Sequence, residues 1–206
     1  EYLEKGEDPS TRELAEGRIA LLEKKMAVLA PKPPPPVRKR YRVGPQAGIA
    51  MTSSTCSGCA SKSGLRVGGC ATAPVHPKYD VQAELWYASK GWLLSGYTIS
   101  LTYLEMPILG RAEFPLGPKS SVHVLAGPSM SLRIGAARLE SPGLKGTLSG
   151  YRSVDYGLHG GAGVLLKLDW GTILIDARLD VGLRNVNAAD ESQTRGYMVT
   201  IGYAAF

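Results

Sequence analysis

The sequence predicts an all-β protein: an eight-stranded antiparallel transmembrane β-barrel with an N-terminal periplasmic amphipathic helix and a proline-rich linker. Three regularities in residues 41–206 predict this fold. Side chains alternate between apolar and polar, short and long connections alternate, and aromatic residues fall at strand ends. No apolar run approaches the roughly 18–20 residues that a spanning helix needs, so a membrane would be crossed by strands of about 9–11 residues.

The alternation is clearest in residues 173–184. Successive side chains of a strand point to opposite faces, so Ile173, Ile175, Ala177, Leu179, Val181 and Leu183 form an apolar face. The other face carries Asp176, Arg178, Asp180 and Arg184. A soluble sheet with one face on a core would alternate in the same way, so the interpretation depends on repetition along the chain.

Seven further segments repeat this pattern: 42–52, 65–75, 79–90, 97–114, 121–135, 155–169 and 195–206. Pro107 lies inside one of them and cannot donate a ladder hydrogen bond, which predicts a bulge or local bend there.

The connections fall into two classes. Tight turns are expected at 75–78, 116–119 and 169–172, and longer polar loops at 53–63, 90–97, 137–153 and 186–194. Outer-membrane barrels have short periplasmic turns and long external loops. Because an even strand number puts both barrel ends on the turn side, we expect the N-terminal segment in the periplasm and the long loops to be extracellular.

Aromatic residues on the apolar face predict two girdles at the membrane interfaces. Their members are Tyr41, Tyr79, Phe114, Trp170 and Tyr203 toward the turns, and Tyr87, Tyr156 and Tyr197 toward the loops.

Charges inside the strands lie on the opposite face, which would line the lumen. The predicted lumen charge network is Glu84, Glu105, Arg111, Arg133, Asp155, Lys167, Asp176, Arg178, Asp180 and Arg184. Isolated charges in a narrow lumen are costly, so we expect them to pair and to crowd the interior instead of lining an open channel. A soluble lipocalin-like barrel would need an apolar lumen, which this charged set argues against.

Three domains are predicted: a periplasmic amphipathic helix in 1–30, a proline-rich linker in 31–40, and the barrel in 41–206. Capping signals around Pro9 and Glu13 start a helix over about 11–29, and prolines at 31 and 33–36 favour polyproline II. The helix is expected either to pack on a neighbour or to bind a partner through Leu14, Ile19, Leu22, Met26 and Leu29.

Chemistry other than membrane anchoring finds little support. Cys56 and Cys59 have a C-x-x-C spacing, for which we favour a loop disulfide over a redox or zinc site; the partner of Cys70 is left open. Basic residues are scattered among acidic ones, so the net charge of +6 does not predict nucleic-acid binding.

An enzyme is not expected, and no cofactor or metal motif is present. The residues His123, His159, Ser129, Ser131 and Asp155 share the lumen face and could form a Ser-His-Asp site, but no nucleophile motif surrounds the serines.

Two motifs resemble a known family. Residues 103–107, Tyr-Leu-Glu-Met-Pro, and 125–129, Leu-Ala-Gly-Pro-Ser, follow the lead-in 83–91, and together they resemble the PorT-like outer-membrane β-barrel family over residues 41–206. The resemblance implies an eight-stranded barrel in a Gram-negative outer membrane without enzymatic activity. The chain departs from the family at its end, because Tyr203 lies three residues before Phe206 instead of two, which predicts a bulge at Ala204 or Ala205 or a frayed last strand.

The resulting functional prediction is a non-enzymatic anchor or subunit of a cell-envelope assembly, in contact with outer-membrane lipid and with envelope proteins or cell wall through the helix. One alternative is the C-terminal barrel of a signal transducer that spans both membranes, like an anti-sigma-factor tether. Others are a lipid-modifying outer-membrane enzyme and a small pore.

Overall fold

The structure is a computed structural model that describes residues 9–29, 41–185 and 193–205. The chain divides into two compact units, Glu1–Arg38 and Lys39–Phe206. The predicted proline-rich linker, 31–40, lies outside the described residues. In the part of the chain that the structure describes, no helix combines the length and apolar character required to cross a membrane.

The N-terminal unit contains one helix, α1 (Pro9–Leu29), which begins two residues earlier than predicted. Its described apolar side chains do not all lie on one face: Ile19 and Leu21 point roughly 160° apart around the helix axis. Ile19, Leu21 and Leu22 are more than half exposed. The expected amphipathic character is therefore weak. The side chains of Leu14, Met26 and Leu29 lie outside the described ones.

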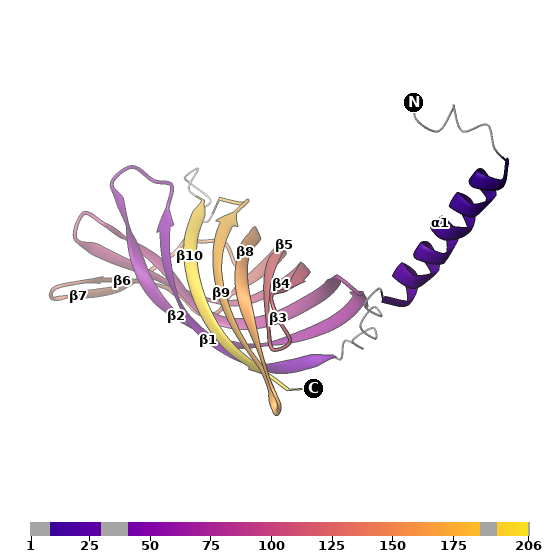
Figure 1. Cartoon of the computed structure of the whole chain (residues 1–206). Helices are drawn as coiled ribbons and strands as arrows, with labels where there is room; N and C mark the ends of the chain where they lie inside the picture. The colour runs from indigo at the N-terminus through magenta and orange to yellow at the C-terminus, as the bar shows by residue number, and fades with distance from the viewer. Residues whose placement is uncertain (1–8, 30–40, 186–192, 206) are drawn as a thin grey trace. The chain divides into compact units, whose positions relative to one another are not determined.

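The second unit is a closed antiparallel barrel (Figure 1). Its eight strands follow the order β3-β2-β1-β10-β9-β8-β5-β4, and pairing between β3 and β4 closes the ring. Their bounds are β1 (Arg42–Ser54), β2 (Cys59–His76), β3 (Tyr79–Leu94), β4 (Tyr97–Pro115), β5 (Ser120–Arg133), β8 (Val154–Leu168), β9 (Gly171–Gly182) and β10 (Thr194–Ala204). The fold prediction is confirmed.

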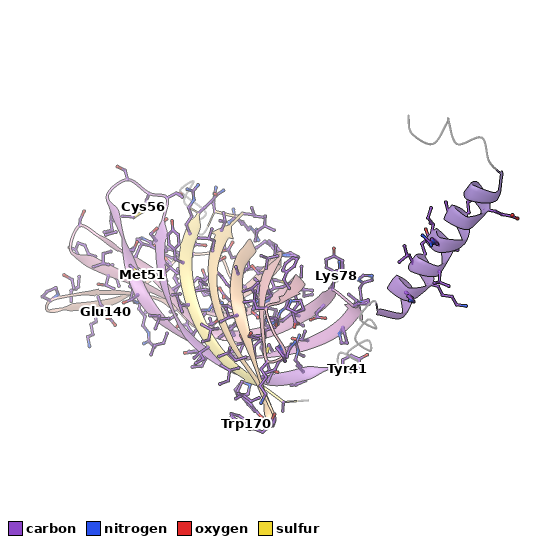
Figure 2. All side chains as sticks on the ribbon, viewed as in Figure 1. Tyr41, Met51, Cys56, Lys78, Glu140 and Trp170 are labelled. Carbon is purple, nitrogen blue, oxygen red and sulfur yellow. A yellow bond between two sulfur atoms is a disulfide. The ribbon has the colours of Figure 1, made fainter. Side chains whose placement is uncertain are left out.

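The barrel has a turn end and a loop end. Tyr41, Lys78 and Trp170 lie toward the turn end, and Cys56 and Glu140 lie toward the loop end (Figure 2). Strands at the loop end continue further than predicted: β3 and β4 meet in a two-residue turn, Ser95-Gly96, in which both residues have positive φ. Two such residues make a hairpin turn whose twist matches that of the flanking strands. The expected loops at 53–63 and 90–97 are therefore mostly strand.

The expected loop at 137–153 is also partly ordered as a hairpin, made of β6 (Ala137–Ser141) and β7 (Leu144–Leu148). β6 pairs with the loop-end overhang of β4 through residues 98–100, and β7 is the outer edge of the ten-stranded sheet. β4 can accept this partner because its pairing with β5 begins only at Tyr103.

The irregularities of the ladder are not where they were predicted. The register of β4 is the same on both sides of Pro107, so the expected bulge is absent there, and the missing donor is tolerated without an extra residue. β10 keeps its register with β9 through Ala204, and Ala205 still bridges Val43. The bulges among the described pairs lie instead in β2, between residues 61 and 66 and between 74 and 76.

The two faces of the barrel carry opposite chemistry. The outer face carries apolar side chains that are between 50% and 70% exposed: Val43, Ile49, Leu65, Val67, Ile108, Val124, Leu179, Val199 and Ile201. Aromatic side chains take the outward positions at the strand ends. The inner face buries charged and polar groups. This inversion of a soluble protein suits an exterior solvated by lipid.

Arginine substitution tests the depth of the outer face in lipid. Val199→Arg, in the middle of β10, is expected to lower the free energy of unfolding by about 2–4 kcal/mol, because a cation at the bilayer midplane loses its hydration. The matched control is Leu183→Arg at the loop end, which should cost about 0–1 kcal/mol. Urea unfolding in phospholipid vesicles measures both, and equal costs would contradict a lipid-facing wall.

Candidate functional site: a charged network in the lumen

The inner face of the barrel holds a dense set of buried ionisable side chains. Among the described residues, five cations are buried there, Arg42, Arg66, Lys90, Arg111 and Arg178, with seven carboxylates, Asp80, Glu84, Glu105, Glu113, Asp155, Asp176 and Asp180. His123, His159 and the partly exposed Lys167 each lie within 4.0 Å of one of these carboxylates. The lumen is therefore close to electrically balanced.

Arg178 forms the centre of this network. Its guanidinium binds both oxygens of Glu84, at 2.7 and 2.8 Å, and donates to Asp176 at 2.6 Å. Glu84 also accepts hydrogen bonds from Gln82 and Trp86, and Asp176 is 2.7 Å from Nε2 of His123. Bidentate geometry with further hydrogen bonds is what allows a charge pair to remain ionised away from water.

Toward the loop end, two cations share one carboxylate. Glu105 contacts both Arg66 and Lys90, and Lys90 also binds Asp180 at 2.5 Å. The guanidinium of Arg66 additionally lies over the Trp86 ring, 5.2 Å from its centroid. Glu105 is completely buried, so its charge is balanced by these two side chains and not by solvent.

Toward the turn end, Glu113 plays the corresponding part. It lies 3.5 Å from Arg42 and 2.9 Å from Lys167, and it accepts a hydrogen bond from Ser121. Arg42 also binds Asp80 at 2.9 Å. The network therefore links β1, β2, β3, β4, β5, β8 and β9 across the lumen.

Apolar side chains enclose the network at both ends. The loop-end cluster consists of Trp92, Ile99, Leu101, Tyr103 and Ala137, all at most 5% exposed, with Leu139, Leu148 and Tyr151 packed against it. A smaller turn-end cluster consists of Leu165, Leu174 and Ala204. Three backbone carbonyls near the start and end of the segment that carries the β6–β7 hairpin accept hydrogen bonds from the Arg133 guanidinium, which holds this segment near the loop-end cluster.

Glycines on the inner face of β8 make room for the larger charged groups. A Cβ atom at Gly163 would lie 2.2 Å from Oδ1 of Asp176 and 2.7 Å from Cε1 of His123. One at Gly161 would lie 2.9 Å from Cγ of Arg178. Glycines without a side chain therefore lie opposite the large side chains of Arg178 and His123.

Most of the predicted network residues do meet in the lumen. Glu84, Asp176 and Arg178 form its centre, Glu105 and Asp180 are joined through Lys90, and Lys167 binds Glu113. Arg111 is buried but binds Gln82 at 2.7 Å instead of a carboxylate, and its other contact is His123. Asp155 is buried, accepts hydrogen bonds from the Tyr156 amide and Thr194, and forms no ion pair among the described residues.

Two predicted members are not in the network. The Arg133 guanidinium binds loop carbonyls, and Arg184 lies beyond the end of β9 and donates to the carbonyl of Val154. Both arginines continue the alternation by sequence. However, β9 ends before Arg184, and the side chain of Arg133 turns toward the loop. The expected membership of Arg133 and Arg184 in the lumen network is therefore wrong.

His123 and His159 were placed on the lumen face by the sequence, but as part of a possible Ser-His-Asp site. Five other network members were absent from the predicted set: Arg42, Arg66, Asp80, Lys90 and Glu113. All of them continue the two-residue period of their strands on the polar face, so alternation was the signal that could have found them. Alternation assigns each side chain to the inner or the outer face of the barrel, but it does not predict which charged side chains form pairs.

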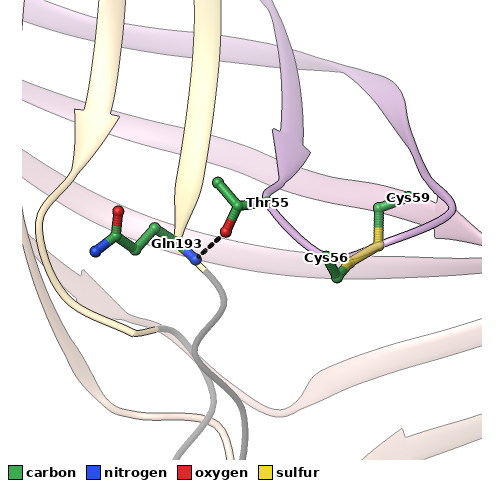
Figure 3. Close-up of a disulfide and its surroundings, with 4 residues drawn as sticks. All are labelled: Thr55, Cys56, Cys59 and Gln193. Carbon is green, nitrogen blue, oxygen red and sulfur yellow. Dashed lines mark hydrogen bonds between the residues drawn. A yellow bond between two sulfur atoms is a disulfide. The ribbon is translucent and has the colours of Figure 1, made fainter.

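The other predicted residues lie as follows. Seven of the aromatic residues expected in the girdles are exposed on the outer face, and Tyr203 is half-buried with its hydroxyl donating to the carbonyl of Trp170. Cys56 and Cys59 form a disulfide in the β1–β2 loop, beside the Thr55–Gln193 contact that extends the β1–β10 ladder (Figure 3). Cys70 is a buried free thiol in the lumen.

The glycine interpretation predicts a steric effect. Gly163→Ala should destabilise the barrel by about 1–3 kcal/mol, because the methyl group forces the His123–Asp176 pair to move. Gly160→Ala is the control, since a Cβ atom there has nothing within 4 Å. Urea unfolding in vesicles compares them; equal stability of the two variants would show that the lumen is loosely packed.

The central pair predicts a second effect. Arg178→Met leaves Glu84 and Asp176 buried without their cation and should cost about 3–5 kcal/mol. Lys119→Met removes an exposed pair with Asp169 and should leave stability unchanged. The midpoint of unfolding in detergent compares the two variants. A small effect of Arg178→Met would mean that water takes the place of the guanidinium beside Glu84 and Asp176.

Comparisons with known proteins agree with this architecture. The sequence matches the family described as outer membrane protein beta-barrel domain over residues 27–187. Among solved structures, Neisserial surface protein A is similar at 12% identity and a TM-score of 0.56, over 81% of this chain and 99% of that one. The outer-membrane enzyme PagL is similar at 12% identity and 0.51, over 76% and 97%.

The attachment invasion locus protein Ail of Yersinia pestis aligns at 15% identity with a TM-score of 0.44, over 81% of this chain and 99% of that one. Among curated proteins, no match to the sequence was found. At these identities Neisserial surface protein A and PagL show a shared fold and nothing of a shared activity. The family match, which covers most of the sequence, shows that this chain belongs to the outer membrane protein β-barrel domain family.

Proposed function

We propose that this protein is a sealed, non-enzymatic barrel that serves as an anchor or subunit of a cell-envelope assembly. The observation that carries the proposal is the inaccessibility of the lumen. Side chains in its centre, among them Trp86, Glu105, Arg66 and Arg178, are at most 2% exposed to solvent. A water-filled channel would expose the charged groups that line it.

The same packing supports the absence of catalysis. Acyl-transfer sites need a nucleophile within reach of a base and a path for substrate. Here Nε2 of His123 lies 2.7 Å from Asp176, and the Ser131 hydroxyl is directed to Glu105 at 3.4 Å. Both histidines are buried among ionised groups. These histidines and serines therefore serve the packing of the lumen.

We further propose that the loop end faces the cell exterior and the turn end the periplasm. Both ends of the barrel strands, Arg42 at the start of β1 and Ala204 at the end of β10, lie at the turn end. Chains with this arrangement keep short turns in the periplasm. The helix α1 would then act on the periplasmic side, and its exposed Ile19 and Leu22 would contact a partner protein or the cell wall.

Membership of the narrower PorT-like group is part of the same proposal, supported by the two sequence motifs. A role as the barrel of a two-membrane signal transducer is the second candidate, favoured by the separation of residues 1–38 from the barrel as a unit of their own. The gene sequence upstream of Glu1 distinguishes the two candidates: a signal peptide favours the anchor, and a spanning helix with a cytosolic domain favours the transducer.

Planar-bilayer recording tests the sealed lumen. The wild-type barrel should give no steady conductance, because most of its lumen charges are paired and apolar clusters enclose them. A variant with Trp92→Ala, Leu101→Ala and Glu84→Ala opens the loop-end cluster and the centre and should give discrete conductance steps. Steady conductance from wild-type protein would favour a pore, and a change in mass of outer-membrane lipids incubated with it would favour an enzyme.

A further inference from the structure

The outer surface of the barrel changes character toward the loop end. The continuous apolar face of the first four strands reaches Met51, Leu65, Tyr87 and Leu104. Several of the next outward positions carry hydroxyl groups, and we call this set the hydroxyl belt: Ser53, Ser63, Ser89, Thr102 and Ser100. On β3, Gly91 and the 38% exposed Leu93 interrupt it. Strands of 13 to 19 residues are longer than the roughly 9–11 needed to cross a bilayer, so their ends extend past the hydrocarbon.

Cations accompany this belt. The ammonium group of Lys62 donates to the hydroxyl of Ser100 at 2.5 Å, and the exposed Arg138 is paired with the same serine in the β4–β6 ladder. On β10, the exposed Arg195 follows the outward alternation two residues beyond Tyr197, toward the loop end. Among the described residues, Glu140, opposite Lys145 in the β6–β7 hairpin, is the one acidic group on this part of the outer face.

The described residues of the turn end form no such row of hydroxyls. Its outward strand positions are apolar or aromatic, including Tyr41, Val75, Tyr79 and Phe114. Its exposed lysines, Lys78 and Lys119, lie in the connections between strands, and Lys119 is paired with Asp169 at 3.3 Å. The two rims of the barrel are therefore built for different surroundings: one ends directly in an aromatic band, and the other adds a zone of hydroxyls and cations beyond it.

We propose that the hydroxyl belt, with Lys62, Arg138 and Arg195, binds the phosphorylated sugar head groups of glycolipids in the leaflet around the loop end. Phosphate oxygens accept charge-assisted hydrogen bonds from lysine and arginine. Serine and threonine hydroxyls both donate and accept, which matches the hydroxyls of a sugar. A phospholipid head group supplies the phosphate but few hydroxyls, so the belt favours a glycolipid over a simple anionic lipid.

This proposal rests on the proposed orientation only for its biological setting, because binding can be measured without reference to a cell. The purified full chain is placed in phosphatidylcholine nanodiscs that contain a small fraction of bisphosphorylated lipid A. Native mass spectrometry then counts the lipid A molecules retained on each barrel. Dephosphorylated lipid A and phosphatidylglycerol are the comparison lipids, and wild-type protein should retain bisphosphorylated lipid A best.

The test variant combines Lys62→Gln, Arg138→Gln and Arg195→Gln, and the matched control combines Lys78→Gln and Lys119→Gln at the turn end. We expect retention to fall by about tenfold in the first and to stay at the wild-type level in the second, since each lost charged hydrogen bond weakens binding several-fold. A Ser100→Ala, Thr102→Ala variant should weaken lipid A binding while leaving phosphatidylglycerol unaffected. Heat-dependent gel migration verifies that every variant is folded.

Equal retention by the loop-end variant and wild type would overturn the proposal, as would equal retention of phosphatidylglycerol and lipid A by the wild type. Neither result bears on the sealed barrel, which is tested by conductance. The orientation is tested separately by biotinylation of Lys145 in intact cells. Lack of labelling there would contradict an exterior loop end while leaving the measured affinity in place.

Discussion

Closure of the sheet is the constraint on which the rest of this structure depends. Backbone groups in hydrocarbon have no water to bond, so every strand needs two paired neighbours, and the pairing of β3 with β4 supplies the last of them. A ring of eight strands leaves an interior just wide enough for side chains. Half of the side chains in these strands must therefore fit together in a space that admits little water.

The lumen network is the solution that this sequence uses. Buried ion pairs often contribute little net stability, because removing charges from water costs about as much as their attraction returns. What they provide is a requirement for particular neighbours: Arg178 must meet Glu84 and Asp176, and Lys90 must meet Glu105 and Asp180. Such requirements discriminate against shifted registers, because a slip by one residue would send these charges into lipid.

The loop end adds a second layer of organisation. β4 extends beyond its pairing with β5 and binds β6, so a hairpin becomes part of the sheet and its Leu139 and Leu148 complete the loop-end cluster. One face of this extension packs over the lumen, while the other presents Ser100 and Arg138 outward. Lys62 of the neighbouring β2 donates to Ser100 on that outer side. In the sealed barrel that we propose, the function of the protein lies at its surfaces.

Alternation along the chain was enough to predict the barrel, its strand number and the assignment of side chains to faces, because a two-residue period is a local property of each strand. As the alternation predicts, Asp176, Arg178 and Asp180 point inward, and the residues between and around them point outward: Ile173, Ile175, Ala177, Leu179 and Val181. The alternation could not predict how far the strands extend past the membrane, because the short strands β6 and β7 depend on pairing with the β4 overhang. It also could not show that Pro107 would be accommodated without a bulge.

Which charges meet in the lumen could be learned from the three-dimensional fold alone. Lys90 and Asp180 are 90 residues apart and lie on strands that do not pair with each other, so their contact depends on the stagger and tilt of the closed ring. The same geometry places Arg133 and Arg184 outside the network although both continue the alternation. The physical reason is that a strand's period sets direction, whereas proximity across a lumen follows from the way all eight strands close.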